Sequence, residues 1–195
     1  MAFLRSSTPM DASPLVRGDG VWLRPPTQDD YAQWASLRAI SRQHLVPFEP
    51  KWTRDELSRA SFRHRLRHYQ RELREDTGYA LFIFSQDTDE LLGGLTLSNV
   101  RRGVTQAASV GYWIGAPYAG RGYMSAAVGA IIPFAFDVLG LHRLEAACLP
   151  DNHVSMRVLE KAGFQREGLA RRYLKIDGVW SDHLLFAIVE DDRRL

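Results

Sequence analysis

The stretch that most constrains the fold runs from residue 109 to residue 139 and combines a strand pattern, a glycine loop and a helix pattern. Val110 to Ile114 carries the β-branched and aromatic side chains that suit a pleated surface. Gly120, Arg121 and Gly122 follow, and apolar residues then recur every three or four positions, as they do on one face of a helix. The sequence therefore predicts a strand that enters a helix through a glycine loop.

This loop predicts a site for an anion. Glycines at 120 and 122 let the backbone approach a ligand closely, and a helix that begins there presents unpaired N–H groups and the positive end of its dipole. The loop has no third glycine of a dinucleotide fingerprint, and it has no lysine and hydroxyl pair of a nucleoside triphosphate loop. Those two classes of phosphate site are therefore excluded.

The loop resembles the central R/Q-x-x-G-x-G/A motif of the GNAT superfamily of acyl-coenzyme A dependent N-acetyltransferases. The matching residues are 117 to 122, in which Pro117 replaces the usual Arg or Gln and leaves the backbone cradle intact. Three other segments are similar to the RimJ type, the ribosomal-protein-alanine N-acetyltransferases. They are Leu97 to Val100, Asn152-x-x-Ser155, and Tyr173 to His183, and the whole resemblance covers Val21 to Val189.

The resemblance implies that acetyl-CoA enters between two strands that splay apart and that the acetyl group passes directly to an amine. No metal is expected, and Cys148 is not needed as a covalent carrier. The implied binding groups are the backbone of Gly111, Tyr112, Trp113 and Ile114 for the pantetheine arm, the amides of Gly120, Arg121, Gly122, Tyr123 and Met124 for the pyrophosphate, and Asn152 for the pantetheine or cysteamine region.

Direct transfer also needs an acid for the leaving thiolate and a way to neutralise the amine. Many GNAT enzymes use a tyrosine as the acid at the position of Leu159, so Ser155 is the candidate here, because it matches a serine proposed for this role in related ribosomal-protein serine acetyltransferases. The alternative is that Ser155 only bonds the helix backbone. Glu49 is the first candidate for the base, with Glu145 and Asp182 behind it. A backbone N–H near residue 113 or 114 is expected to stabilise the oxyanion.

The resemblance favours the N-terminal α-amine of a ribosomal protein, with an alanine or serine N-terminus, as the acceptor. An α-amine with a pKa near 8 costs about 1.4 kcal/mol to neutralise at pH 7, whereas a lysine costs about 4.6 kcal/mol, so water could serve as the base for the first. Two alternatives stay open. One is a small-molecule amine such as a polyamine, an aminoglycoside or an amino acid, and the other is a non-catalytic acyl-CoA-binding module.

The remaining pattern predicts an α/β (α+β) GNAT fold, with a mixed, largely antiparallel twisted sheet of about seven strands and helices on both faces. We expect a flexible N-terminal arm over 1–19, one domain over 20–190 and a polar tail over 191–195.

A helix over 54–75 is predicted to begin at a Thr53 cap with Glu56 in a capping box. Pro133 is expected to bend the central helix, with Gly129 relieving part of the clash. The strands are expected at 21–24, 79–84, 91–97, 109–114, 141–149, 165–176 and 179–189.

Composition limits the partners only weakly. The formal net charge of +2 gives no strong argument for nucleic acid. The Arg-rich face of the helix over 54–75 is either a solvated surface or a surface that meets ribosomal RNA on the ribosome or an acidic partner. With one cysteine, no internal disulfide can form. No apolar stretch is long enough to cross a membrane, and 1–14 has no signal-peptide pattern, so a cytoplasmic monomer or homodimer is expected.

Overall fold

The computed structural model describes residues 15–194 and contains a single eight-stranded sheet in the order β1-β2-β3-β4-β5-β6-β8-β7. Only β5 and β6 pair in parallel, and every other neighbouring pair is antiparallel. The strands are β1 (Val16–Gly18), β2 (Val21–Arg24), β3 (Tyr79–Ser85), β4 (Leu91–Arg101), β5 (Ala107–Ile114), β6 (Arg143–Cys148), β7 (Gln165–Ile176) and β8 (Val179–Val189).

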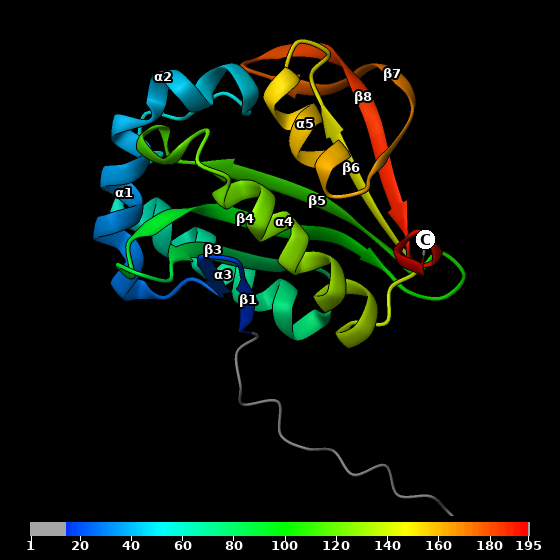
Figure 1. Ribbon diagram of the computed structural model, residues 1–195. Coiled ribbons are helices and arrows are strands. Elements are labelled where there is room, and N and C mark those ends of the chain that lie inside the picture. The colour runs from blue at the N-terminus through cyan, green and yellow to red at the C-terminus, as the bar shows by residue number, and fades with distance from the viewer. Residues whose placement is uncertain (1–14, 195) are drawn as a thin grey trace, which may run out of the picture.

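Helices cover both faces of this sheet, as the sequence predicted. In Figure 1, α4 and α5 lie in front of the sheet and α3 lies behind it. The larger core joins the front helices to β-strand residues such as Leu97, Val110 and Leu144, and the second core packs Trp34 and Phe62 against the other face. The helices are α1 (Tyr31–Ile40), α2 (Arg42–Leu45), α3 (Arg59–Glu75), α4 (Tyr123–Pro133) and α5 (His153–Lys161).

The sheet begins earlier than the sequence predicted. Val16–Gly18 forms β1 and pairs with β2, so the segment expected as a flexible arm over 1–19 ends in a strand; its first fourteen residues lie outside the described part. Val16 is buried in the larger core. Three residues with one buried side chain give no alternating pattern, which is why this strand escapes a sequence search. The polar segment after β8 contains a short 3₁₀ turn, Glu190–Arg194.

The start of α3 was predicted wrongly. The helix begins at Arg59, and Ser58 is the cap, because its Oγ accepts a hydrogen bond of 3.1 Å from the N–H of Ser61. The Thr53 hydroxyl instead bonds the side chains of Asp55 and Glu56. Glu56 forms an ion pair of 2.5 Å with Arg65, so the expected capping box is not formed at this site.

Pro133 changes the geometry of the central helix without ending it. The α-helical part of α4 stops at Pro133, and a π-helical turn over Phe134–Val138 continues it. This turn accommodates a residue that lacks an N–H donor and whose ring clashes with the preceding turn. A Cβ built on Gly129 would meet nothing within 4 Å outside the local helix backbone, so the glycine is not needed to accommodate the ring.

The last third of the chain follows its sequence signals closely. Gly163 has φ of 91°, and the N–H groups of Gly163 and Phe164 donate to the carbonyls of Glu160 and Leu159, which closes α5 as expected. Asp177 and Gly178 both have positive φ and join β7 to β8 as a two-residue hairpin turn. Within residues 15–194, no helix is both long and apolar enough to cross a membrane.

Candidate active site

The centre of the sheet opens between β5 and β6. These strands pair over only three residue pairs, which end at Ser109 and Glu145. Beyond that point β5 remains paired with β4, and β6 remains paired with β8. The edge of β5 from 110 to 114 that faces β6 therefore has no partner among the described strands. Its backbone N–H and C=O groups are left for a ligand, because such groups are rarely left unpaired.

The glycine loop lies at the open end of this gap. It runs from the end of β5 through a 3₁₀ turn to α4, and Gly120 and Gly122 have φ of 74° and 87°. A Cβ on either glycine would meet no atom within 4 Å, so the space above the loop is open. Gly122 caps α4, and the first amides of α4 have no intrahelical acceptor. This geometry is suited to the anion that the sequence predicted at this loop.

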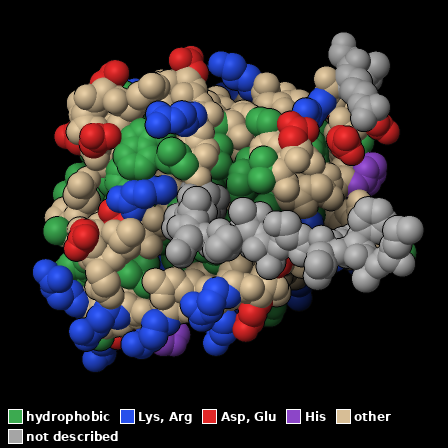
Figure 2. Space-filling model, turned by 90° about the horizontal axis from the view of Figure 1, so that it is seen from below, with side chains coloured by type: hydrophobic (Ala, Val, Ile, Leu, Met, Phe, Trp, Pro, Cys, Tyr) green, Lys and Arg blue, Asp and Glu red, His purple; other side chains and the backbone are tan. Residues whose placement is uncertain are grey.

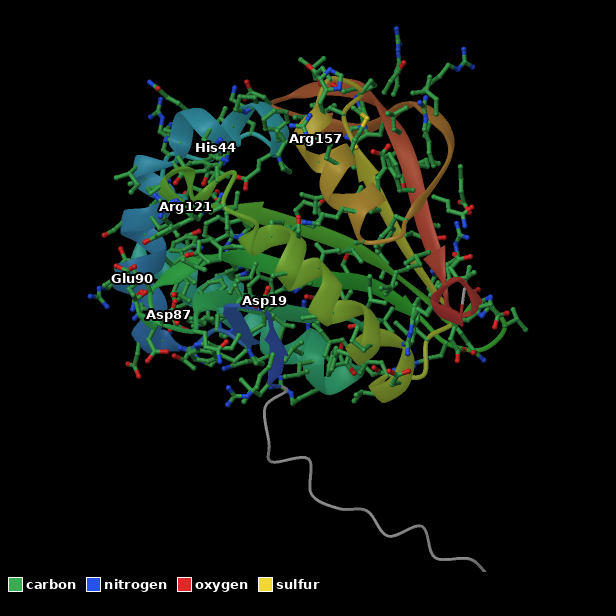
Figure 3. The ribbon with its side chains drawn as sticks, viewed as in Figure 1. Asp19, His44, Asp87, Glu90, Arg121 and Arg157 are labelled. Carbon is green, nitrogen blue, oxygen red and sulfur yellow. The ribbon has the colours of Figure 1, made fainter. Side chains whose placement is uncertain are left out.

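Basic side chains surround the same end of the molecule. In Figure 3 the labelled side chains of His44, Arg121 and Arg157 come from α2, the loop before α4, and α5. All three are exposed. The positive charges of Arg121 and Arg157 would raise the local concentration of an anionic ligand.

A serine and a tyrosine meet across the gap. Asn152 caps α5, since its Oδ1 accepts a hydrogen bond of 3.0 Å from the N–H of Ser155. The Ser155 Oγ lies 2.8 Å from the phenol oxygen of Tyr112 on β5, and either atom can donate. The Ser155 hydroxyl thus bonds a side chain on β5. This differs from the alternative in the sequence analysis, in which Ser155 only bonds the backbone of its own helix.

Burial controls the ionisation of this pair. It raises the pKa of Tyr112 to about 12, although the hydrogen bond from Ser155 acts in the opposite direction. Burial likewise raises the pKa of the nearby Cys148 thiol. Tyr112 therefore keeps its proton at neutral pH and can pass it to Ser155.

Glu49, the first candidate for the base, is held in an ion pair. Arg38 donates to its two carboxylate oxygens at 3.1 and 2.5 Å, and the Trp52 indole donates at 2.7 Å. The Arg38 guanidinium is buried and also lies over the rings of Trp52 and Trp113. The backbone carbonyl of Glu49 accepts from the N–H of Asp177, in the β7–β8 turn. This geometry anchors the loop to the hairpin and leaves neither carboxylate oxygen without a donor.

The two reserve candidates are also engaged. Glu145 forms ion pairs of 2.5 Å with Arg101 and 3.0 Å with Arg143. The Asp182 carboxylate accepts a hydrogen bond of 2.8 Å from the backbone N–H of Arg172, which has a positive φ. Like Glu49, each has a structural partner that the sequence did not reveal.

A polar groove lies on the sheet face opposite α4 and α5. It has a volume of about 480 Å³, and its lining comes from α3, β4, β5, β6 and β7. Ser109 and Glu145 form part of its floor, and they alternate with Val110 and Leu144, which point into the front core. The groove lies where β5 and β6 begin to diverge. A second substrate could therefore reach the gap from the face that the front helices do not cover.

The structure brings the predicted site residues to one end of the β5–β6 gap. The predicted β5 positions lie along the gap, the predicted loop residues lead into α4, and Asn152 and Ser155 lie at the start of α5. Sequence reasoning missed the Tyr112 side chain, Arg38 and the glycines at 93 and 94, where a Cβ would lie 2.3 Å from the carbonyl oxygen and 2.5 Å from the indole nitrogen of Trp113. The glycine pair opposite a tryptophan was the sequence signal that could have indicated this close packing.

Among the described residues, no group of three His, Cys, Asp or Glu side chains could hold a metal ion.

Known proteins share this architecture. A family model described as an acetyltransferase (GNAT) domain matches residues 21–165. The chain belongs to the GNAT acetyltransferase family. It is therefore an enzyme of the N-acetyltransferase class, and the splayed strands and the glycine loop are the parts of that fold described above.

Two curated relatives support this assignment. The probable N-acetyltransferase YjcK of Bacillus subtilis is 37% identical over 178 residues, which cover 91% of this chain and 98% of the relative. The [ribosomal protein uS5]-alanine N-acetyltransferase of Escherichia coli is 33% identical over 158 residues, which cover 81% of each chain.

A solved structure gives the same result. Mycobacterium smegmatis RimJ in complex with CoA-disulfide has a TM-score of 0.85 and 34% identity, and the match covers 92% of this chain and 88% of that one. The resemblance to GNAT enzymes of the RimJ type and the fold class predicted from the sequence are both confirmed. The sheet has eight strands in place of the predicted seven or so.

Proposed function

We propose that this GNAT enzyme transfers the acetyl group of acetyl-CoA to the N-terminal α-amine of a protein, with a ribosomal protein as the favoured substrate. The observation that carries the reaction is the separation of β5 from β6 beyond Ser109, with a glycine loop at its open end and a groove on the far face. Two substrates can then meet in the gap from opposite faces of the sheet.

The donor side would hold acetyl-CoA through the groups that the sequence predicted. Backbone groups of Gly111 to Ile114 would pair with the pantetheine arm, and the amides of 120 to 124 would hold the pyrophosphate. Asn152 already uses its carbonyl oxygen to cap α5, so only its amide nitrogen is left to donate to the pantetheine. The related RimJ structure contains CoA-disulfide, which supports a CoA ligand here.

The acetyl group would pass directly from the thioester to the amine, without an acyl-enzyme. The neutral amine attacks the carbonyl carbon, a C–N bond forms, and the C–S bond breaks. A backbone N–H near Trp113 or Ile114 would stabilise the oxyanion, an effect that typically contributes a factor of about 100 to 1,000. The departing thiolate takes a proton from Ser155, and Tyr112 replaces it across their hydrogen bond of 2.8 Å.

The acceptor assignment is supported by the relatives. The relative from Escherichia coli acts on an alanine of ribosomal protein uS5, and a structure of similar fold from Vibrio fischeri is a ribosomal-protein-S5-alanine acetyltransferase, with 30% identity and a TM-score of 0.84. An α-amine is also easier to neutralise than a lysine, by about 3 kcal/mol at pH 7. Such a substrate would place the reaction in the cytoplasm.

The test is an acceptor panel. Purified protein is incubated with acetyl-CoA, and thiol release is followed with peptides that begin with alanine or serine, with the same peptides blocked at the α-amine, and with polyamines and aminoglycosides. Turnover confined to the unblocked peptides is expected. Turnover only on small amines would overturn the acceptor assignment and keep the reaction class, whereas acetyl-CoA binding without turnover on any amine would favour a binding module.

A further inference from the structure

We propose that His183, on β8, accepts the proton that the acceptor amine must lose before it attacks the thioester. This inference rests on the proposed transfer to an α-amine. It assigns the base to a residue that no sequence motif marked for that role.

The hydrogen bonds of the imidazole fix which nitrogen can accept a proton. Its Nδ1 lies 2.9 Å from the backbone carbonyl oxygen of Ser181, and a carbonyl can only accept, so Nδ1 carries the hydrogen. Nε2 then holds a lone pair in the neutral ring. Among the described residues Nε2 has no hydrogen-bond partner, although only 2% of His183 is exposed. The ring is therefore held in the tautomer that a general base needs.

The strand register places His183 at the open end of the gap, on the sheet face opposite α4 and α5. Leu184, Phe186 and Ile188 point into the front core, so His183, which alternates with them, points to the opposite face. Leu184 pairs with Cys148, the last residue of β6, so His183 is the first β8 residue beyond the end of β6 in this ladder. No strand residue of β6 lies beside it.

Ser155, the proposed acid, lies near the same end of β6 but on the sheet face that α4 and α5 cover. Burial and a hydrogen bond from Ser155 both act on the Cys148 thiol, so Ser155 lies next to the β6 residue that pairs with Leu184. Ser155 and His183 thus lie near the same end of β6, one on each face of the sheet. This is the arrangement that direct transfer requires, since one group protonates the thiolate and another deprotonates the amine from the opposite side.

One residue that lines the polar groove packs against the imidazole. Tyr173 lines the groove, and its ring packs edge-on against His183 with centroids 6.0 Å apart. Tyr173 is half exposed, and within residues 15–194 it is the one aromatic side chain whose ring packs against the imidazole. Tyr173 therefore connects the lining of the groove to the imidazole ring.

The carboxylates on this side are less suited to the task. Glu49 is bonded by Arg38 and Trp52, and Glu145 is bonded by Arg101 and Arg143. To take a proton, each would have to give up an ion pair that already fixes its side chain. His183 would break no ion pair or hydrogen bond when Nε2 takes a proton.

The proton balance of the step is complete. Nε2 of His183 takes one proton from the acceptor ammonium, and the neutral amine then forms the C–N bond. The C–S bond breaks and the thiolate receives a proton from Ser155. As the tetrahedral intermediate collapses, the second proton of the attacking nitrogen passes through solvent to the Ser155–Tyr112 pair and replaces the one that the thiolate took. The imidazolium returns its proton to solvent, so the net products are the acetylated amine, the free thiol and one proton.

Two substitutions separate a base from a structural histidine. In His183→Asn the side-chain amide can still donate to the Ser181 carbonyl, but Nε2 is gone; in His183→Gln the amide reaches the place of Nε2 without being able to take a proton. We expect kcat on an alanine-terminated peptide to fall about 100-fold at pH 7 in both variants. Acetyl-CoA affinity and Tm should stay close to those of wild type, and His64→Asn, on the exposed face of α3, serves as the control.

The pH dependence gives a readout that a structural role would not change. The α-amine has a pKa near 8 and is about a tenth neutral at pH 7, so raising the pH to about 9.5 should recover about tenfold of the deficit in the variants. A wild-type rate in His183→Asn would overturn the inference, and so would a deficit that does not change with pH. If wild-type protein turns over no α-amine at all, the proposed function fails instead, and the two failures are distinguishable.

Discussion

At the scale of single residues, the proposed chemistry depends most on the hydrogen bond of 2.8 Å between Ser155 and Tyr112. Ser155→Ala removes the hydroxyl but keeps the α5 cap, because Asn152 bonds the Ser155 backbone N–H and not its side chain. We therefore expect kcat to fall about 100-fold while acetyl-CoA affinity hardly changes. Steady-state kinetics and calorimetric titration measure the two quantities.

Tyr112→Phe gives the companion measurement. Because burial holds the Tyr112 pKa at about 12, the phenol is protonated throughout the assay range, and its loss should lower kcat without adding a new pH limb below pH 9. An unchanged kcat in Ser155→Ala would remove Ser155 from the acid role. A large loss of acetyl-CoA affinity would make the pair part of the binding site instead.

The same scale shows why the base could not be chosen from the sequence. A loop glutamate near a substrate face looks available in a sequence, and Glu49 was chosen on that ground. In the fold, Arg38 reaches it from eleven residues away along the chain, and Trp113 contributes a ring from a distant strand. Partners set by tertiary packing leave no local pattern. In the sequence, His183 appeared only as the last residue of the segment from Tyr173 that is similar to the RimJ type, with no role of its own.

At the scale of elements, the start of α3 can be tested directly, because the chain offers two competing caps. Ser58→Ala should lower the free energy of unfolding by about 1 kcal/mol, since the Ser61 N–H loses its acceptor. Thr53→Ala should change it by less than about 0.5 kcal/mol, because the Thr53 hydroxyl bonds only exposed side chains. Urea denaturation of both variants gives the comparison, and a larger cost at Thr53 would restore the start that the sequence predicted.

The elements also show where sequence patterns suffice. The α5 cap and the Asp177-Gly178 turn depend on residues within a few positions of one another, so a local pattern is enough to predict both. Thr53 and Glu56 have the right spacing for a capping box, yet Glu56 pairs with Arg65, nine residues later. A motif of two residues cannot exclude a better partner farther along the chain.

At the scale of the whole molecule, the fold could be predicted because strand patterns, turn residues and the loop motif agree with one another. The gap could not be placed to the residue. It depends on where the β5–β6 pairing stops, which is at Ser109, and no side chain there marks the end. The polar groove could likewise not be predicted from the sequence, since five elements contribute to it.

The charge distribution supports one further expectation, which concerns the whole surface. The helix α3 exposes a row of basic residues, and Figure 2 shows Lys and Arg side chains gathered along one edge of the molecule. Their spacing leaves Arg67 between Arg63 and Arg71, so Arg67→Glu creates favourable i, i+4 pairs and keeps the helix stable. The variant therefore changes the surface charge without removing the element.

If this surface meets ribosomal RNA, Arg67→Glu should lower kcat/KM for a ribosome-bound substrate several-fold at low salt and leave a short peptide substrate unaffected. The difference should shrink as salt rises, since exposed charges are screened beyond about 8 Å at physiological ionic strength. Lys161→Glu, at the end of α5, makes the same change in net charge elsewhere on the surface and serves as the control. Equal effects of the two reversals would indicate a response to net charge alone, and no effect on the ribosome-bound substrate would leave α3 as a solvated face.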